Sequence, residues 1–535
     1  MTVPPTRRTV LLGLLGITLF AAGLRWWMVA HTAMPSRDCL IFVRIALQLY
    51  DPPKSRFDAV RQLDGPADVL RETDQPPGYP LAILGAAKLL RYDLDTATGD
   101  QMVFAAQLVS AVCGVLLTFP LFGVASRLFG PAVGLLACLW FQLLPVFTEV
   151  TSDGLSDGLF LLTAAGAMWF GLNVLNRQKW YGGLAHGFLA GVCVGAGYLV
   201  RPDSLIVGGA IGVVLAGTCV ARWSRKARGL PVFLGGVGLV VATALLMYPY
   251  VSIIGKLTNK PSLSDAQAAA PAVSIPLAAW RDANAVGSKE VWAAKALGTE
   301  VLKGTHYLLP FFALAGVLRA RKRWGEAEIL LPLAVLLLHL GVLWYLAVRA
   351  GYVSQRHTLL TGMVGAVFAA SALPCAGALG VRLFKIGSAP LWTGLWVLLI
   401  AGVCLPRDFH SLHADRAGHR AAGEWLAREG NSHFSVVDPF GWAEFYSGRT
   451  VRGWTTANPI RRPFVYTVLE PNAASPHSRL PWLADANKLA ARGEVVFQYP
   501  PDVPPDRIKV AVYRSPPLQF AESEEGIRRA NGAVP

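Results

Sequence analysis

The stretch RRTVLLGLLGITLFAAGLRWWMVA, residues 7–30, sets the fold class of this chain. Two arginines precede a long apolar run, and Trp26 and Trp27 stand near its end. A run of about 20 apolar residues is long enough to cross the hydrocarbon core of a bilayer. Signal peptides have shorter apolar regions and a small-residue cleavage site, which is absent after this run. The stretch therefore predicts a retained transmembrane helix with an aromatic anchor at the membrane interface.

Similar apolar runs recur along the chain, which predicts a mainly α-helical, polytopic membrane protein. The chain is 53% hydrophobic and 16% charged, and its mean hydropathy is +0.42. Soluble proteins carry about 25% charged residues. We expect about eleven transmembrane helices, of which the eighth and the eleventh are short. The candidate spans are residues 10–30, 102–125, 131–147, 158–175, 183–200, 204–220, 232–254, 306–318, 329–348, 359–379 and 391–405.

The positions of the basic residues predict the orientation of these spans. The net charge is +15, but Lys and Arg lie in short loops between apolar runs. Nucleic-acid binders instead carry basic clusters on a soluble domain, so no nucleic-acid partner is expected. With the N-terminus in the cytoplasm, every basic cluster falls on the cytoplasmic side, as the positive-inside rule requires. These clusters contain Arg7, Arg8, Arg127, Arg177, Lys179, Arg222, Arg225, Lys226, Arg228, Arg319, Arg321, Lys322, Arg323, Arg382 and Lys385.

This orientation predicts two domains in a plasma (inner) membrane protein. Residues 1–405 form the transmembrane domain, with a long first extracytoplasmic loop, 31–101, that contains interfacial helices. Residues 406–535 form a small extracytoplasmic α/β domain, with a helix at 419–430 and strands at 434–438, 494–499 and 508–513. This domain either covers the outer opening as a structural cap or recognises an acceptor or partner.

The first outer loop carries two polar motifs. In PSRDCLIFVRIALQL, residues 35–49, Ser36 caps a helix and Asp38 lies in its first turn. Asp38 is either a capping residue of an interfacial helix or a general base at the mouth of the membrane domain. In DQPPGYP, residues 74–80, two prolines fix the backbone of a re-entrant or surface helix. Asp74, Gln75 and Tyr79 are the candidate substrate-binding residues of this motif.

Two further motifs lie where outer ends of spans meet. FTEVTSDGLSDGLFLL, residues 147–162, contains Glu149, Asp153 and Asp157. The spacing of Asp153 and Asp157 predicts one shared helix face, with Asp153 as a helix cap. Asp157 lies at or inside the span, where a charge is costly and indicates function. GYLVRPDSLIV, residues 197–207, places Arg201 beside Asp203, either as a local ion pair or as a functional group.

A fifth motif, VRAGYVSQRHTLL at residues 348–360, gathers basic residues on the outer side. Arg349, Tyr352, Arg356 and His357 lie close together in the sequence. The positive-inside rule disfavours this placement, so an anionic ligand is expected to compensate. The guanidinium fork suits phosphate oxygens. His357 is more often a hydrogen-bonded structural group than a metal ligand. Carboxylates near guanidinium groups at the outer surface therefore predict a lipid-linked phosphate donor and a carboxylate base.

These residues resemble a known family. RDCLIFVRIALQL and QPPGYPLAIL are similar to the first outer loop of the GT-C glycosyltransferases, which include protein O-mannosyltransferases and aminoarabinose transferases acting on lipid A. LSDGLFLL, GYLVRPDSLIV and GYVSQRHTLL resemble their later outer-face motifs, and EWLAREG and AEFYSGRT resemble segments of their tails. The resemblance covers roughly residues 10–450, and the shared order of its motifs is more specific than any single match.

The resemblance implies an inverting transfer of a sugar from a polyprenyl-phosphate donor in the membrane lipid to an extracytoplasmic acceptor. The acceptor is a protein, a lipid or a glycan. Asp38 matches the family's general base. Arg201 and Arg356, and further Arg349, are expected to bind the donor phosphate, with Asp157, Tyr352 and His357 as substrate-binding residues. Many relatives have histidine at Gln75, which weakens a metal role there. Some relatives use a divalent metal, for which Asp38, Glu149 and Asp157 offer oxygen ligands.

Two other functions compete with this interpretation. A transporter or lipid flippase also places polar residues in the membrane. Transporters, however, often show internal repeats and broken helices near the midplane, whereas no clear repeat is seen here and the polar residues lie at the outer ends of spans. A scaffold for envelope assembly leaves the outer arginines unexplained.

Overall fold

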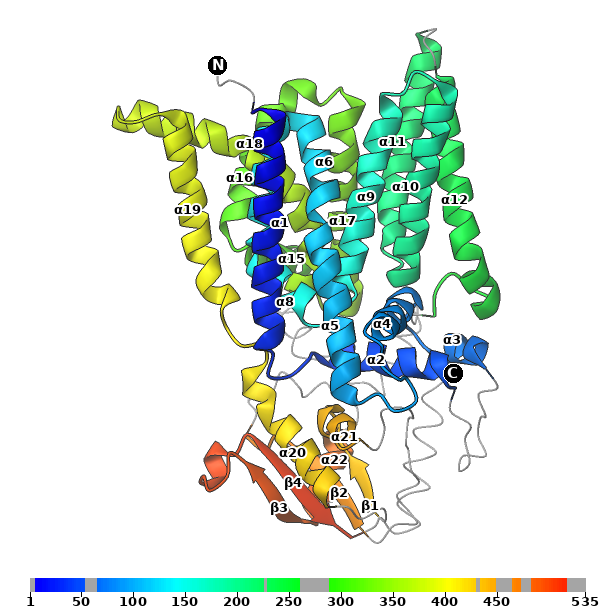
Figure 1. Ribbon diagram of the computed structural model, residues 1–535, viewed down its shortest axis with the longest axis vertical. Coiled ribbons are helices and arrows are strands. Elements are labelled where there is room, and N and C mark those ends of the chain that lie inside the picture. The colour runs from blue at the N-terminus through cyan, green and yellow to red at the C-terminus, as the bar shows by residue number, and fades with distance from the viewer. Residues whose placement is uncertain are drawn as a thin grey trace.

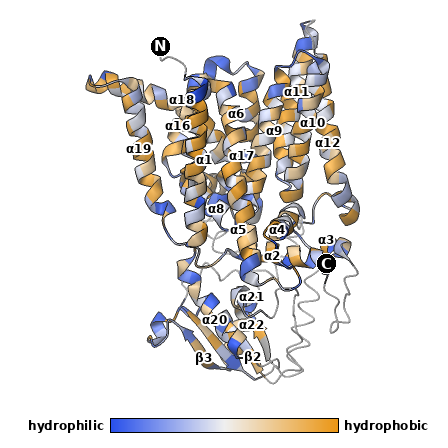
Figure 2. Cartoon of the chain, in the orientation of Figure 1, coloured by the Kyte–Doolittle hydropathy of each residue, from blue (hydrophilic) through white to orange (hydrophobic). Residues whose placement is uncertain are grey.

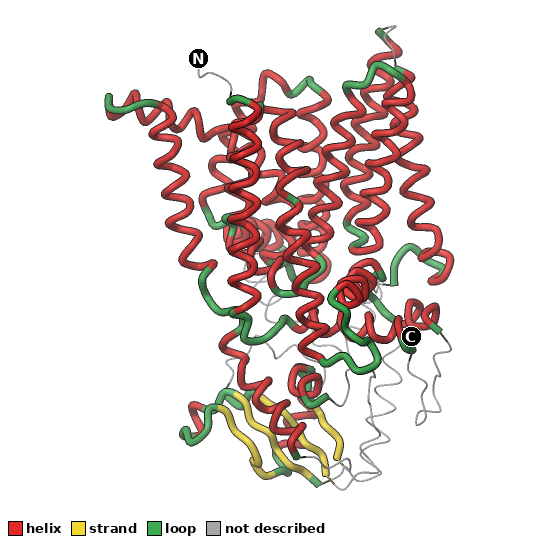
Figure 3. Tube along the Cα trace, viewed as in Figure 1, coloured by secondary structure: helices red, strands yellow, loops and turns green. Residues whose placement is uncertain are grey.

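The computed structural model describes residues 5–52, 65–225, 229–259, 288–429, 434–448, 464–472 and 483–516. Helices form a long bundle, and a small sheet with its own helices lies beyond one end of it (Figures 1 and 3). Figure 2 shows that the bundle helices are mostly hydrophobic along their length. Part of the predicted first outer loop, residues 53–64, lies outside the described residues.

The bundle confirms a polytopic membrane protein. Among the described residues, nine helices are long and apolar enough to cross a membrane, and the number is eleven if each of two bent pairs forms one span. The upper number agrees with the predicted count. The bundle helices are α1 (Arg7–Ala30), α5 (Gly99–Leu116), α6 (Thr118–Phe129), α7 (Pro131–Gln142), α8 (Pro145–Ser152), α9 (Asp157–Leu175), α10 (Trp180–Val200), α11 (Ser204–Ser224), α12 (Leu230–Ile254), α15 (Lys289–Gly304), α16 (Leu308–Arg319), α17 (Ala327–Ala350), α18 (Leu359–Phe384) and α19 (Ala389–Asp408).

The two bent pairs explain the segments that the sequence predicted least well. Helices α7 and α8 meet at 65°, and α8 begins at Pro145, which needs no backbone donor there. The span predicted at 306–318 is short because it is only the second half of a pair: α15 precedes α16 at an angle of 101°, and the η1 turn (Ala320–Arg323) extends α16. The last predicted span, 391–405, is longer than expected, because α19 continues to Asp408.

Helices α10 and α12 pack so closely that glycine is required between them. A Cβ atom on Gly187 would overlap the backbone carbonyl of Gly235, and one on Gly191 would overlap the carbonyl of Leu239. Small residues allow helix backbones to approach closely within a membrane, where van der Waals contact drives association. This pair holds the α10–α11 turn in a fixed position at the sheet end of the bundle.

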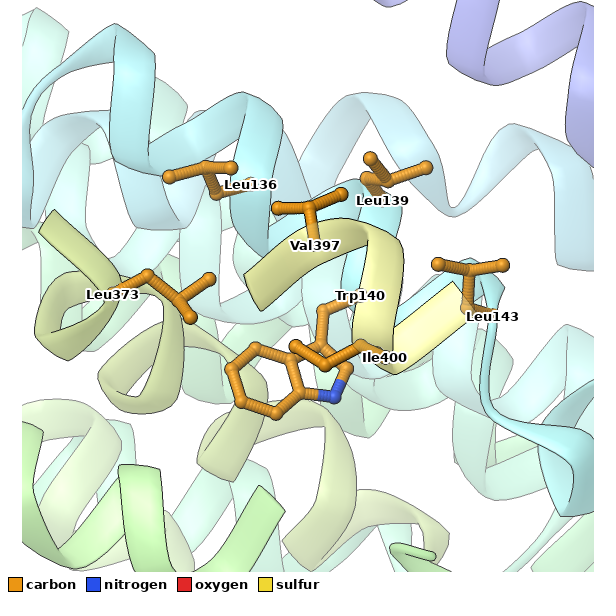
Figure 4. A pocket seen from close by; sticks show the side chains of 7 residues that line it. All are labelled: Leu136, Leu139, Trp140, Leu143, Leu373, Val397 and Ile400. Carbon is orange, nitrogen blue, oxygen red and sulfur yellow. The ribbon is translucent and has the colours of Figure 1, made fainter. Parts of the chain in front are cut away.

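Figure 4 shows one of the places where helix α19 packs on the bundle through apolar side chains. Side chains of α7, the turn after it, α18 and α19 surround a void of about 10 Å³. They are Leu136, Leu139, Trp140, Leu143, Leu373, Val397 and Ile400. A void of this size and polarity is part of the packing and holds no polar chemistry.

The basic loops gather at one end of the bundle. The turns after α6, α9, α11, α16 and α18 lie at the end where α1 begins, away from the sheet (Figures 1 and 2). Arg127, Arg222 and Arg382 lie in the last turns of α6, α11 and α18, Arg177 follows α9, and Arg321 lies in η1. These basic residues therefore lie at the same end of the bundle, as expected if alternate loops lie on the same side of the membrane.

Three short helices lie across the other end of the bundle: α2 (Arg37–Tyr50), α3 (Pro66–Glu72) and α4 (Gly78–Leu89) (Figure 1). The Ser36 side chain caps α2 by accepting a hydrogen bond from the Cys39 N–H at 3.3 Å, as predicted. Helix α4 begins directly after Pro76 and Pro77, also as predicted. Its apolar residues pack on α2 and α5 rather than crossing the bundle.

The C-terminal layer is a small α/β unit. Its sheet has the order β1-β2-β4-β3, with β1 and β2 parallel and the other pairs antiparallel. Strand β2 was not predicted, although its FVYTVL sequence is rich in β-formers. The elements are η3 (Ala414–Arg416), α20 (Ala417–Arg428), β1 (Phe434–Val437), α21 (Trp442–Tyr446), β2 (Phe464–Leu469), α22 (Leu483–Ala490), β3 (Glu494–Tyr499), η5 (Pro505–Arg507) and β4 (Val510–Ser515).

This unit contacts α2 and the start of α5 through charged pairs. Arg44 of α2 reaches Glu444 of α21 at 3.7 Å, and Arg420 of α20 reaches Asp100 at 2.9 Å. Burial lowers the pKa of Arg44, although the carboxylates of Glu444 and Asp438 oppose that effect. The sheet unit is therefore docked on α2, the helix that carries Asp38.

Candidate active site

A polar cavity of about 120 Å³ lies at the sheet end of the bundle. Five parts of the chain build it: α2, the segment before α4, the start of α9, the end of α10, and the η2 turn (Gln355–Thr358) before α18. Its lining residues are Asp38, Ile41, Phe42, Gln75, Ser156, Arg201, Arg356 and His357. Five of these eight were predicted as site residues, and they come from four separate motifs.

Asp157 is the centre of the charged cluster beside the cavity. Its side chain is only 2% exposed, and it forms ion pairs with Arg201 through Oδ1 and with Arg356 Nε through Oδ2, the latter at 2.5 Å. A buried carboxylate is tolerated when paired charges and hydrogen bonds satisfy it. Asp157 therefore fixes both guanidinium groups at the cavity wall rather than facing a ligand itself.

Asp38 lies at the mouth of the cavity, where solvent reaches it. Its side chain is 51% exposed, and its Oδ2 accepts a hydrogen bond from Arg356 Nη1 at 2.5 Å. Arg356 thus bridges the buried Asp157 and the exposed Asp38. Among the described residues, the remaining amino group of Arg356, Nη2, has no hydrogen-bond partner. This amino group and an exposed carboxylate therefore stand side by side.

Arg201 is held by several groups at once. Besides Asp157, it pairs with Asp203 at 3.0 Å, which confirms the local ion pair expected within this turn. Its guanidinium also lies over the Phe160 ring, 5.4 Å from the centroid. The planar guanidinium group is suited to such stacking and to bidentate pairing. The Arg201 guanidinium is therefore preorganised at the cavity wall.

His357 faces the cavity with a defined tautomer. The backbone N–H of Ser354 donates to His357 Nδ1 at 3.2 Å, so the proton of the neutral ring is on Nε2. Tyr352, which is exposed, packs edge-on against the His357 ring at 5.7 Å. His357 can therefore donate one hydrogen bond, while Tyr352 supports its ring from outside the cavity lining.

The residues of the DQPPGYP motif lie in different places: one lines the cavity and another is buried in the core. Gln75 lines the cavity, whereas Asp74 is exposed and outside the lining. Tyr79 is fully buried, and its hydroxyl donates to the Ala106 carbonyl at 2.9 Å and contacts Ser110 Oγ at 2.7 Å. Burial raises the pKa of Tyr79. The structure thus places Tyr79 in the contact between α4 and α5, where it has no access to the cavity.

Arg349 also lies away from the cavity lining. It is exposed near the end of α17, and its guanidinium lies over the Tyr345 ring at 5.4 Å. The sequence placed it near Arg356, but α17 ends at Ala350 and the chain turns at Gly351 before η2 begins. Its predicted phosphate contact has no support in this arrangement.

The prediction that Asp153 and Asp157 share a helix face is wrong. Helix α8 ends at Ser152, and Gly154 has φ +70°, so the chain turns before α9 begins at Asp157. Asp157 faces the arginines, whereas Asp153 accepts a hydrogen bond from the Ser36 N–H at 2.7 Å. Asp153 is a helix cap as expected, but it caps the distant helix α2.

The predicted metal ligands do not fit a divalent cation. Across the described ranges, no three His, Cys, Asp or Glu side chains are grouped so that they could hold a metal ion. The carboxylates of Asp38 and Asp157 are both paired with Arg356, which a cation would have to displace. Glu149 lies on α8 and is absent from the cavity lining. These residues therefore do not form the oxygen site proposed from the sequence.

Three lining residues were not identified from the sequence. Ser156 stands in a quoted motif, but its hydroxyl gave no separate signal beside two aspartates. Ile41 and Phe42 stand in the motif at residues 35–49, and neither was predicted as a site residue.

A family model matches about a third of the chain. Residues 74–248 match the family model described as dolichyl-phosphate-mannose-protein mannosyltransferase. This segment contains Gln75, Asp157 and Arg201. No curated protein sequence matches the chain significantly.

Two solved structures share the fold over nearly the whole chain. The archaeal oligosaccharyltransferase AglB from Archaeoglobus fulgidus, in complex with an inhibitory peptide and a dolichol-phosphate, superposes with a TM-score of 0.56 at 13% identity, covering 95% of this chain and 77% of its own. ArnT from Cupriavidus metallidurans, bound to undecaprenyl phosphate, gives a TM-score of 0.56 at 12% identity, with 95% and 98% covered. The chain therefore has the fold of the membrane-embedded GT-C glycosyltransferases.

Proposed function

We propose that the chain is a glycosyltransferase that moves a sugar from a polyprenyl-phosphate donor to an extracytoplasmic acceptor. The observation that carries this proposal is the meeting of Asp38, Arg201 and Arg356 at one cavity, from α2, the α10–α11 turn and η2. Two proteins of the same fold are described with dolichol-phosphate and undecaprenyl phosphate bound. A polyprenyl phosphate is the ligand that both the guanidinium groups and the membrane position favour.

In the proposed reaction, the acceptor nucleophile attacks the anomeric carbon of the donor sugar. A new bond forms from the acceptor to this carbon, the bond to the phosphate oxygen breaks, and the configuration inverts. Asp38 takes the proton of the nucleophile as general base. The leaving polyprenyl phosphate is already anionic, so it needs cationic stabilisation rather than a proton, and Arg201 and Arg356 supply it.

The position of Arg356 suggests how the site changes when the donor binds. Its Nη1 holds the Asp38 carboxylate, while its Nε is held by the buried Asp157. A donor phosphate would compete with Asp38 for this guanidinium, since both are anions at the same mouth. Donor binding would thus release the carboxylate that must act as base, and Asp157 would keep Arg356 in place during the exchange.

The other residues that line the cavity have supporting roles in this proposal. Gln75 and the Nε2–H of His357 face the cavity and would hydrogen-bond hydroxyls of the sugar. The apolar side chains of Ile41 and Phe42 would limit water at the reacting carbon. Tyr79 and Arg349 have no part in the proposed site, because neither lines the cavity.

The proposed orientation follows the positive-inside rule. The turns that follow α6, α9, α11, α16 and α18 lie at the end of the bundle away from the sheet unit (Figure 1). With these turns in the cytoplasm, the N-terminus is cytoplasmic and the cavity and the sheet unit face the extracytoplasmic side of the inner membrane.

A donor panel tests the proposal. Purified full-length protein in lipid nanodiscs is incubated with polyprenyl phosphates carrying different labelled sugars and with an envelope fraction from cells lacking the gene. We expect one donor to transfer its label to the envelope fraction and to release polyprenyl phosphate, and Asp38→Asn to abolish both. Movement of intact donor across the bilayer without cleavage would contradict the proposal and favour a flippase.

A further inference from the structure

Ser36, the N-cap residue of α2, lies two residues before Asp38. It is hydrogen-bonded to a residue from a distant part of the chain. In a capping box, the backbone N–H of the N-cap residue donates a hydrogen bond to a side chain three residues on. In α2 that residue is Cys39, which has no carboxylate or amide. Asp153 takes its place, because its Oδ1 accepts the Ser36 N–H at 2.7 Å. The position of Asp38 thus depends on a carboxylate between α8 and α9.

Asp153 is in turn held by His413, from the segment between α19 and α20. His413 Nε2 contacts Asp153 Oδ2 at 3.0 Å, and the side chains are 19% and 4% exposed. His413 has φ +52°, in the left-handed region that L-residues rarely adopt. Such a conformation persists where the surroundings fix it strongly. The histidine is therefore fixed in place beside the carboxylate.

The same segment also holds the backbone that leads into α2. The Leu412 carbonyl accepts the Ala33 N–H at 3.1 Å, and Ser411 Oγ donates to the His31 carbonyl at 2.5 Å. From α21, the buried Trp442 donates its indole N–H to the Pro35 carbonyl at 3.0 Å. Residues 411–442 thus hydrogen-bond the main chain of residues 31–35, which directly precede α2 and Asp38.

We propose that His413 and Asp153 are positioning residues for Asp38. His413 orients the Asp153 carboxylate, Asp153 fixes the first turn of α2, and α2 presents the Asp38 carboxylate to the cavity. This inference rests on the proposed transferase function. Neither residue lines the cavity, so both act through α2 and not on the substrate. The C-terminal segment thereby contributes to the rate without supplying a reacting group.

The proposal predicts a pH dependence with a defined sign. Burial by itself would lower the pKa of His413, but the hydrogen bond to Asp153 and its charge, aided by Glu149 and opposed by Arg416, raise it above its ordinary value. A group with a raised pKa in the folded protein makes its contribution fully below the unfolded value of about 6.5. The contribution of the charged pair is lost as the pH rises through the raised value.

The experiment uses the full-length protein in nanodiscs with three variants: His413→Ala, His413→Gln and the control His410→Gln. His410 lies three residues earlier and is exposed. Transfer is measured with undecaprenyl-phosphate mannose, or with the donor that the panel above identifies, and binding with undecaprenyl phosphate alone. We expect His413→Ala to lower kcat by about 10- to 100-fold, the loss typical of a misplaced catalytic group. The affinity for undecaprenyl phosphate stays within twofold, because Arg201 and Arg356 are untouched.

The conservative variant His413→Gln distinguishes a positioning role of His413 from a purely stabilising one. The amide of His413→Gln still donates to Asp153, so we expect it to restore most of kcat and to remove the loss of rate at alkaline pH. His410→Gln should match the wild type throughout. Where His413→Ala fails to fold, Trp442→Phe weakens the same support of α2 and should also lower kcat. It removes the hydrogen bond to Pro35 and alters the ring contacts of Trp442 with Arg416, His419 and Phe440.

Two results would overturn the positioning role while leaving the transferase proposal intact. One is wild-type kcat in His413→Ala, and the other is a His413→Gln variant as impaired as His413→Ala. A wild-type protein that transfers no sugar from any donor of the panel would overturn the proposed function itself.

Discussion

The sharing of Arg356 between a carboxylate and a phosphate makes a counterintuitive prediction for Asp38→Asn. This variant should lose transfer, because the general base is gone, and yet bind undecaprenyl phosphate more tightly than the wild type. The reason is that the Asp38 carboxylate no longer occupies Arg356 Nη1, which it holds at 2.5 Å. The guanidinium is then available to the ligand without a competing anion.

The exposure of the pair sets the size of the effect. The Asp38 side chain is 51% exposed and that of Arg356 is 24% exposed, so water screens their attraction. Ion pairs of this kind contribute about 0.2–1 kcal/mol. At the upper end, its removal would lower the Kd for undecaprenyl phosphate roughly fivefold. The pair between Arg356 and the buried Asp157 is unchanged in the variant.

The assay is equilibrium binding of radiolabelled undecaprenyl phosphate to the purified full-length protein. Asp95→Asn is the matched control, because it removes the same charge from the same outer loop at an exposed position outside the cavity lining. We expect Asp95→Asn to bind as the wild type does. An unchanged or higher Kd for Asp38→Asn would refute the competition for Arg356.

A double-mutant cycle separates competition for Arg356 from direct repulsion between Asp38 and the phosphate. If the effect passes through Arg356, Asp38→Asn will not tighten binding in an Arg356→Gln background, and the interaction energy will equal the single-variant effect. If the tightening persists in that background, direct repulsion is its cause, and the proposed release of Asp38 by the donor is wrong.

The other predictions concern the arginines, the buried carboxylate and the helix packing. Arg356→Ala should weaken undecaprenyl phosphate binding at least tenfold, as expected for loss of a charged hydrogen bond. Arg349 is exposed outside the cavity lining, so Arg349→Ala should leave binding unchanged. Equal effects of the two variants would show that Arg349 also binds the phosphate. Asp157→Asn leaves two partly buried guanidinium groups without their shared carboxylate and should destabilise the protein by about 1–3 kcal/mol, which an unchanged thermal midpoint would contradict. Gly187→Ala should destabilise the protein by about 1–3 kcal/mol through overpacking. Gly212→Ala should not, because a Cβ atom at Gly212 has no neighbouring atom within 4 Å. Similar thermal midpoints for the two variants would refute the close contact of α10 and α12.

The sequence predicted the structural features that depend on a few neighbouring residues. Apolar runs longer than about 18 residues have one stable solution in a bilayer, the helix, so the number of spans was predictable. The cap at Ser36 and the proline start of α4 were predictable for the same reason, since a few neighbouring residues determine them. Short spans were harder, because a bend such as that between α15 and α16 divides one hydrophobic signal into two weak ones.

The sequence also identified five of the residues that line the cavity, but it did not identify their partners. Asp38, Asp157 and Arg356 stand far apart in the chain, and only packing of α2, α9 and η2 brings them together. Sequence spacing even misled at Asp153 and Asp157, because a glycine with positive φ turns the chain between them.

The sequence by itself thus determined the membrane class, the alternation of charged loops and the types of side chain available for chemistry, since hydrophobicity and charge act residue by residue. The tertiary structure alone decided that Arg356 bridges Asp38 and Asp157, that Tyr79 is buried in the core and that the C-terminal segment holds the start of α2. These contacts join residues separated by long stretches of chain, and their formation depends on how the helices pack and not on any local pattern.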